Sequence, residues 1–189
     1  NDILVVESNG PGTEPKDMPK QLIMSVVKNA SGKAGKGGNR ITLLRYTNGV
    51  WEKHIFLENL YSPFGVQVVG DTLYVANADG IMKYHYQPGS TKITDSGQFL
   101  ADLPSGYNHH WTKALLASPD GSTLCVGVGS NSNVLESGAD AEYRRAAILE
   151  VDAKTGASRI FASGLRNPTG IQWEPVSGKL WAIVNERDE

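Results

Sequence analysis

Three segments of this 189-residue chain repeat one pattern: Gly70-Asp71-Thr72-Leu73-Tyr74-Val75, Gly121-Ser122-Thr123-Leu124-Cys125-Val126 and Gly178-Lys179-Leu180-Trp181-Ala182-Ile183. In each copy a glycine suited to a tight turn is followed by a short apolar run, which is typical of the second strand of a β-hairpin. The central leucines lie 51 and 56 positions apart (124 − 73 and 180 − 124). A strand pattern that recurs at this interval indicates a β-propeller, whose four-stranded blades repeat every ~40–50 residues.

The segments around each hairpin complete the four-stranded unit. A strand that opens on a short motif precedes each copy: Ser-Pro-Phe-Gly at 62–65, His-His-Trp-Thr at 109–112 and Asn-Pro-Thr-Gly at 167–170. We predict strands at Ile3–Glu7, Ile41–Tyr46, His54–Leu57, Gly65–Val69, Thr72–Ala76, Ile81–Tyr86, near Gly97–Leu100, and at Lys113–Ala117, Leu124–Gly127, Ala146–Val151, Arg159–Ala162, Gly170–Trp173 and Leu180–Val184. The chain is therefore predicted to be all-β and to cover about three propeller blades and the start of a fourth.

Composition excludes several classes of protein. Lys and Arg number 18 against 20 Asp and Glu, so the net charge of −2 lacks the basic excess of a nucleic-acid-binding protein. No apolar run approaches the ~18 residues of a membrane span, and the single cysteine, Cys125, rules out an intrachain disulfide framework. Residues 9–40 interrupt the repeat and are interpreted as a solvated insertion. We expect residues 1–189 to form part of one propeller domain, without a nucleic-acid partner or a membrane span.

Two adjacent histidines, His109 and His110, lie at the start of the innermost strand of a predicted blade. Innermost strands line the central channel of a propeller, so a side chain there can reach a ligand at the channel mouth. Neighbouring residues of a strand point to opposite faces, so we expect only one of the two to face a ligand. The alternative is that both are structural histidines of the channel or the core.

The corresponding position one blade later reads Gly164-Leu165-Arg166-Asn167-Pro168-Thr169-Gly170. Arg166 offers a rigid fork of donors for oxygen atoms, and Asn167 offers both a donor and an acceptor. This motif is a second candidate ligand site. The alternative is a turn that joins two blades, in which Arg166 caps backbone carbonyls.

Two further polar stretches are weaker candidates. The terminal Asn185-Glu186-Arg187-Asp188-Glu189 presents the oxygen ligands that Ca²⁺ prefers, although an acidic strand end is more often simply solvated. Residues 128–133 (Val-Gly-Ser-Asn-Ser-Asn), with Glu136 and Arg144-Arg145, could line a sugar site or form a plain cluster of turns.

Five of these motifs, in this order along the chain, resemble the sorbosone dehydrogenase group. They are His-His-Trp-Thr-Lys (109–113), Pro-Asp-Gly-Ser-Thr-Leu (119–124), Val-Gly-Ser-Asn-Ser-Asn (128–133), Gly-Leu-Arg-Asn-Pro-Thr-Gly (164–170) and Val-Asn-Glu-Arg-Asp-Glu (184–189). This group belongs to the wider family of soluble glucose and aldose sugar dehydrogenases that use pyrroloquinoline quinone (PQQ). The resemblance runs from about Asp2 to Glu189, and the family fold is a six-bladed β-propeller. Trp111-Thr112-Lys113 follows the sorbosone branch, whereas the wider family often has Gly-Gly-Arg there, which argues against glucose as the substrate.

The resemblance implies a role for each matching residue. His110 would be the general base that takes the proton of the substrate hydroxyl, with His109 as the second choice. Arg166 and Asn167 would hold and polarise the quinone oxygens. Ca²⁺ would activate PQQ as a Lewis acid, with Asp188 and Glu189 among its ligands.

The function implied by the resemblance is that of a quinoprotein oxidoreductase acting on a sugar or a sugar-derived aldehyde such as sorbosone. A cytochrome or a quinone would accept the electrons, and the location would be periplasmic or secreted. A Ca²⁺-dependent propeller lactonase and a non-catalytic propeller that binds other molecules are the alternatives. A six-bladed ring needs roughly twice this length at ~50 residues a blade, so we expect the sequence to be incomplete at its C-terminus.

Overall fold

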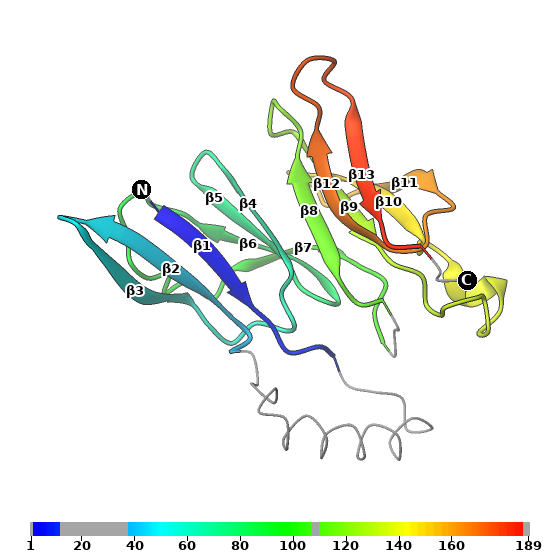
Figure 1. Cartoon of the computed structure of the whole chain (residues 1–189), viewed down its shortest axis with the longest axis horizontal. Coiled ribbons are helices and arrows are strands. Elements are labelled where there is room, and N and C mark those ends of the chain that lie inside the picture. The colour runs from blue at the N-terminus through cyan, green and yellow to red at the C-terminus, as the bar shows by residue number, and fades with distance from the viewer. Residues whose placement is uncertain (1, 12–37, 107–109, 187–189) are drawn as a thin grey trace, which may run out of the picture.

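A computed structural model describes residues 2–11, 38–106 and 110–186 (Figure 1). These residues form thirteen β-strands and one short 3₁₀-helix. The elements are β1 (Asp2–Glu7), β2 (Arg40–Thr47), β3 (Val50–Leu57), β4 (Gly65–Val69), β5 (Thr72–Ala76), β6 (Gly80–His85), β7 (Gln98–Asp102), β8 (Lys113–Ala117), β9 (Thr123–Val128), η2 (Ala139–Glu142), β10 (Ala147–Asp152), β11 (Ser158–Ser163), β12 (Pro168–Trp173) and β13 (Leu180–Val184). The prediction of an all-β fold is confirmed.

The strands pair into four antiparallel sheets that follow one another in chain order. The first sheet has the order β1-β2-β3, the second β4-β5-β6-β7, the third β8-β9-β10-β11 and the fourth β12-β13. The second and third sheets are thus the four-stranded units that the sequence predicts. In the part of the chain that the structure describes, the sheets do not close into a ring.

The repeated leucines occupy equivalent places in the three hairpins. Leu73 pairs with Val68 in β4, Leu124 with Ala117 in β8 and Leu180 with Trp173 in β12. The glycines that turn these hairpins all have positive φ, namely Gly70 (56°), Gly121 (73°) and Gly178 (66°). Only glycine adopts that backbone region at little cost, so the repeated glycine sets the turn and hence the register of each hairpin.

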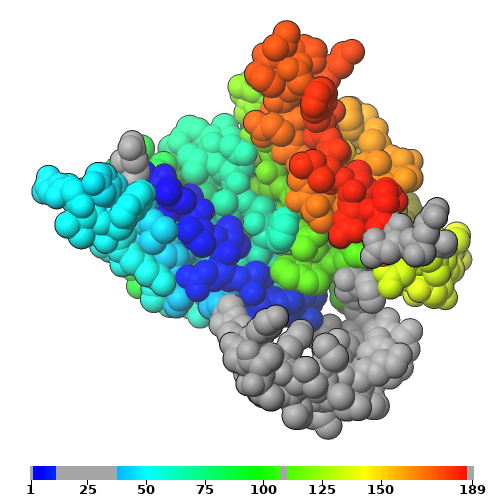
Figure 2. Space-filling view, viewed as in Figure 1, coloured from blue at the N-terminus to red at the C-terminus, as the bar shows by residue number. Residues whose placement is uncertain are grey.

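Consecutive sheets pack face to face and bury an apolar layer between them. One cluster joins the first and second sheets through residues such as Ile41, Leu43 and Leu73, and another joins the second and third through residues such as Leu115, Val126 and Leu149. The first strands of successive sheets touch, β4 against β8 and β8 against β12. Figure 2 shows this order as bands from blue and cyan, through green, to orange and red. Stacking through apolar faces is how propeller blades stabilise one another.

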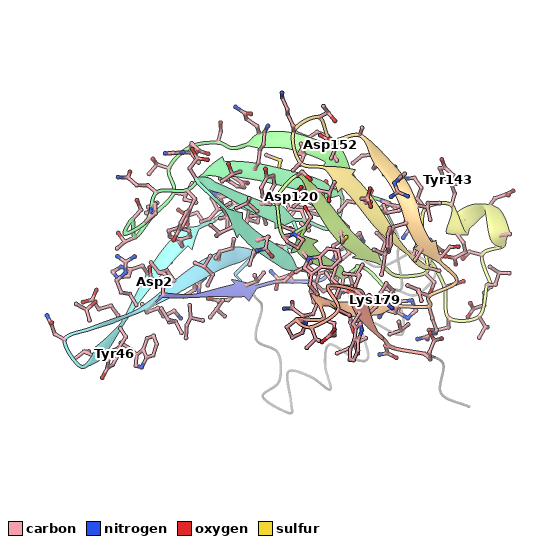
Figure 3. All side chains as sticks on the ribbon, turned by 90° about the horizontal axis from the view of Figure 1, so that it is seen from above. Asp2, Tyr46, Asp120, Tyr143, Asp152 and Lys179 are labelled. Carbon is pink, nitrogen blue, oxygen red and sulfur yellow. The ribbon has the colours of Figure 1, made fainter. Side chains whose placement is uncertain are left out.

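The two ends of the sheets differ. The glycine turns of the β4–β5, β8–β9 and β12–β13 hairpins project at one end, uppermost in Figure 1. Residues 110–112 before β8, residues 164–167 before β12 and residues 129–131 after β9 lie at the other end. Figure 3 shows the periphery, with Tyr46 at the tip of the β2–β3 hairpin and Tyr143 beside η2. Among the described residues, no helix has the length and apolar character to cross a bilayer.

Candidate active site

His110 lies three residues before β8 and is half-buried. Its Nδ1 atom is 2.9 Å from the hydroxyl oxygen of Ser130 and 3.1 Å from the carbonyl oxygen of that residue. The Ser130 hydroxyl donates its own hydrogen to the Ser132 carbonyl (2.7 Å), so both Ser130 oxygens face His110 as acceptors. Nδ1 of a neutral His110 therefore carries the proton, and Nε2 is its proton acceptor.

The backbone that carries His110 is fixed by its neighbour Trp111. The indole packs edge-to-face on Phe64, with ring centroids 6.1 Å apart and an interplanar angle of 87°. It also lies against Gly10, where a Cβ atom would be 3.2 Å from the indole Nε1. The segment before β8 is thus held by the second sheet and by the residues after β1.

Asn167 lies directly before β12 and is 7% exposed. Its backbone carbonyl accepts a hydrogen bond from Asn185 N (2.9 Å), so the end of β13 holds it in place. Its side-chain Oδ1 is buried and has no hydrogen-bond partner. Buried amide oxygens are nearly always satisfied, so this atom indicates a place for a water molecule or a ligand.

Gly129 brings His110 and Asn167 together. A Cβ atom at this position would overlap the Cβ atom of His110 and would lie 2.5 Å from Asn167 Oδ1. The missing side chain therefore leaves the space in which the two residues approach each other. A further link is the hydrogen bond from Ser130 N to the Arg166 carbonyl (2.8 Å). The two motifs that the sequence separates by more than fifty residues thus converge on one site at one end of the sheets.

The Arg166 guanidinium belongs to the same cluster, but most of its N–H groups donate hydrogen bonds to other groups of the protein. Nε donates to the Asn133 carbonyl (3.2 Å) and Nη2 to Asn133 Oδ1 (2.6 Å). Nη1 donates to the carbonyls of Asn185 (3.2 Å) and Glu186 (3.3 Å). These bonds match the alternative in which Arg166 caps carbonyls, and they use four of its five N–H groups.

Glu142 anchors the loop that connects the two halves of the site. Its carboxylate accepts hydrogen bonds from the backbone N–H groups of Asn131 (2.8 Å) and Ser132 (3.3 Å). The anchored loop contacts His110 through Ser130 and Arg166 through Asn133. Glu142 is therefore a positioning residue of this cluster.

A family model described as TrAA12-like matches residues 35–189 of the chain. This protein belongs to the TrAA12-like family. Among solved structures, the holo form of the pyranose dehydrogenase PQQ domain from Coprinopsis cinerea superposes with a TM-score of 0.65 at 22% identity, covering 80% of this chain and 40% of that one. The iodide structure of the Carbohydrate-Active Enzymes Family AA12 protein from Trichoderma reesei gives a TM-score of 0.68 at 20% identity, covering 78% and 41%.

The calcium structure of the Trichoderma reesei protein gives a TM-score of 0.65 at 20% identity, covering 79% of this chain and 41% of that one. At these identities the likeness is one of fold. An uncharacterized protein of Borreliella burgdorferi is 25% identical over 142 residues, which are 69% of this chain and 36% of that protein. The TrAA12-like chain thus spans about 40% or less of each of these proteins.

Three of the predicted site residues lie outside the described part of the TrAA12-like chain: His109, Asp188 and Glu189. Within the described residues, no group of three or more His, Cys, Asp and Glu side chains could hold a metal ion. The predicted calcium ligands therefore remain a prediction.

The sequence did not single out the partner of His110 or the anchor Glu142. Ser130 stood in the polar stretch at 128–133, but nothing in the sequence distinguishes it from the serines and asparagines beside it.

The sequence likewise gives no sign that Lys113, close to His110 in the chain, is buried. It is the first residue of β8, is fully buried and donates from Nζ to the Trp111 carbonyl (2.9 Å). Burial, and then the neighbouring Arg145 cation, lower the pKa of its ammonium group to about 7, while Asp79 acts in the opposite direction.

Proposed function

We propose that this TrAA12-like protein is part of a PQQ-dependent oxidoreductase that oxidises a sugar or a sugar-derived aldehyde of the aldose or sorbosone type. The observation that carries the proposal is the approach of His110 and Asn167 across Gly129. It brings the residue proposed as the base close to a buried amide oxygen, Asn167 Oδ1, that lacks a hydrogen-bond partner. The fold likeness to the PQQ domain of the Coprinopsis cinerea pyranose dehydrogenase supports the choice of cofactor.

The residues of the site fit a quinone cofactor. Asn167 has a buried side-chain oxygen without a partner, and Arg166 retains one N–H beyond its four bonds to the protein. These two side chains would hold the quinone oxygens, and Asp188 and Glu189 would bind the Ca²⁺ ion. PQQ, when bound, supplies the acceptor for the hydride that leaves the substrate carbon.

The role of His110 follows from its hydrogen bonds. Because Nδ1–H is held by Ser130, Nε2 is the ring atom that would accept the proton of the substrate hydroxyl. The carbon that bears this hydroxyl would lose its hydrogen as a hydride, for which bound PQQ would supply the acceptor; the hydroxyl-bearing carbon of an aldose, or of a hydrated aldehyde, would thereby become a carbonyl. The histidine then returns its proton to solvent. Ser130 keeps the ring in the tautomer that this transfer requires.

The wider setting is also proposed. We expect the four sheets to be part of a six-bladed propeller, with residues 1–189 inside that single domain. A cytochrome or quinone would reoxidise the cofactor, and the protein would work in the periplasm or outside the cell.

The test is reconstitution with PQQ and Ca²⁺, desalting, and dye-coupled oxidation of aldoses and sorbosone. We expect quinone absorbance to stay with the protein and the dye to be reduced. His110→Ala should lower turnover by about 10²–10⁴-fold while quinone absorbance is retained. His54→Ala, at a half-buried histidine on β3 that pairs with Glu52, is the matched control and should leave turnover unchanged. If no quinone is retained and no sugar is oxidised, the proposal is wrong. If the wild-type protein is active and His110→Ala is equally active, the oxidation stands but the base is another residue.

A further inference from the structure

A cleft lies on the second sheet, and its lining does not include His110. It has a volume of about 270 Å³, close to the lower end of small-molecule pockets (~300 Å³). Its lining includes Asn59, Tyr61, Asn77, Asp79, Tyr84 and Phe99, and we call it the β6–β7 cleft. It adjoins a larger cleft of about 440 Å³, because Tyr84 and Ser96 line both.

Two exposed aromatic side chains flank the β6–β7 cleft. Phe99, the second residue of β7, is 64% exposed, and Tyr61 is 48% exposed. The Phe99 ring lies against Gly80, where a Cβ atom would be 2.7 Å from its Cε2 atom. The absence of a side chain at Gly80 thus allows the Phe99 ring to pack on the sheet, while most of the Phe99 side chain faces solvent. Such a ring is an apolar surface held in a fixed position.

Tyr61 is held in place by its own backbone. Its carbonyl accepts a hydrogen bond from Ala78 N (3.0 Å), and the preceding Leu60 N donates to the Asn39 carbonyl (3.0 Å). Asn59, one residue earlier, has a φ of 63°, a left-handed conformation that turns the chain there. The segment that joins the first and second sheets therefore presents Asn59 and Tyr61 at the cleft in a set arrangement.

The polar groups that line the β6–β7 cleft can form hydrogen bonds with the hydroxyl groups of a ligand. The Asp79 carboxylate and the Asn59 amide are both exposed at the cleft. Asn77 is 6% exposed, and its Oδ1 atom is buried without a hydrogen-bond partner. A carboxylate and amides can each bond two neighbouring hydroxyls, and bonds to the ionised carboxylate are the stronger ones.

We propose that the β6–β7 cleft binds a sugar ring of a saccharide, as a site separate from the proposed oxidation site. A pyranose ring has apolar C–H faces and polar hydroxyl edges, so it matches a cleft whose lining combines the aromatic Phe99 and Tyr61 with the polar Asp79, Asn59 and Asn77. The adjoining larger cleft, lined by Asp71, Lys83, His85 and Asp95, gives room for a second sugar unit. This site does not depend on PQQ, and its existence is independent of the proposed oxidation.

The experiment is an NMR titration of the protein, without PQQ, with cellobiose, maltose and xylobiose at millimolar concentration. We expect shifts of the amide signals of Asn59, Asn77 and Gly80, and saturation transfer from aromatic protons to the sugar. Phe99→Ala should weaken binding about tenfold, which corresponds to ~1.4 kcal/mol. Tyr143→Ala, at a 76% exposed tyrosine beside η2 (Figure 3), is the matched control and should bind as wild type.

Asp79→Ala separates loss of binding from loss of fold. It removes an exposed side chain, so the spectrum should keep its dispersion while the affinity falls about tenfold. The proposal is overturned if none of the three sugars shifts these signals, or if Phe99→Ala and Tyr143→Ala weaken binding equally. Dye-coupled turnover with a monosaccharide should be the same for Phe99→Ala and wild type, which keeps this site distinct from the proposed oxidation site.

Discussion

Gly129→Ala adds one methyl group at the point where His110 and Asn167 meet. The new carbon would overlap His110 Cβ and lie 2.5 Å from Asn167 Oδ1, whereas ordinary van der Waals contact begins at 3.4 Å. Both residues must therefore move away from the new carbon by about 1 Å, since each lies about 1 Å inside that limit. A displacement of ~1 Å at a reacting group can lower turnover by about 10²-fold, and forced overpacking destabilises by about 1–3 kcal/mol. Gly129 does not have a positive φ, so the backbone itself accepts alanine.

Gly170→Ala is the matched control for this change. Gly170 lies in β12 near Asn167, also lacks a positive φ, and a Cβ atom there would meet only Ile183, at 3.6 Å or more. We expect Gly170→Ala to keep wild-type melting temperature and dye-coupled turnover. Gly129→Ala should lower the melting temperature by about 2–4 °C for each kcal/mol and reduce turnover about 10²-fold. Wild-type turnover and stability in Gly129→Ala would show that His110 and Asn167 do not meet as described.

Two further predictions concern a buried cation and a loop anchor. The pKa of Lys113 is about 7 in the folded protein and 10.5 ordinarily. Between these two pH values the unfolded chain therefore binds more protons than the folded one. The free energy of unfolding should accordingly rise with pH from pH 7 upward, by up to about 1.4 kcal/mol per pH unit. In urea unfolding at several pH values, Lys113→Met should lack this slope, and parallel curves for variant and wild type would contradict the assignment. Glu142→Ala removes the acceptor of the Asn131 and Ser132 N–H groups and should speed hydrogen exchange at both amides, whereas the exposed Glu58→Ala should not. Unchanged exchange in Glu142→Ala would mean that the loop is held by other contacts.

The repeated hairpins were predictable because their physics is local. A glycine with positive φ turns each hairpin, and in the two four-stranded sheets the leucine that follows it is fully buried, as Leu73 and Leu124 show. Each leucine therefore pairs near the end of the preceding strand, Leu73 with Val68, Leu124 with Ala117 and Leu180 with Trp173. The convergence of His110 and Asn167 was also predictable, since each lies in the segment that leads into the first strand of its unit, three residues before β8 and directly before β12.

The finer geometry of the site depends on contacts between distant segments, which the sequence does not encode locally. Arg166 offers the same five donors whether it binds a ligand or caps carbonyls, and only the fold brings Asn133 and Asn185 within its reach. Lys113 at the head of a strand suggests a solvated cation, yet the packing of the second sheet on the third buries it completely. Ser130 gains its role only because Nδ1 of His110 meets it across the sheet end.

The central claim is that His110 and Asn167 form two walls of one quinone site. A crystal structure of the protein grown with PQQ and Ca²⁺ tests it most directly. We predict quinone density at the end of β8 and β12, with a quinone oxygen within hydrogen-bond distance of the Asn167 amide and His110 Nε2 facing the open side of the ring. Density for the quinone elsewhere on the protein, or a crystal soaked with PQQ and Ca²⁺ that shows only water beside Asn167, would contradict the account.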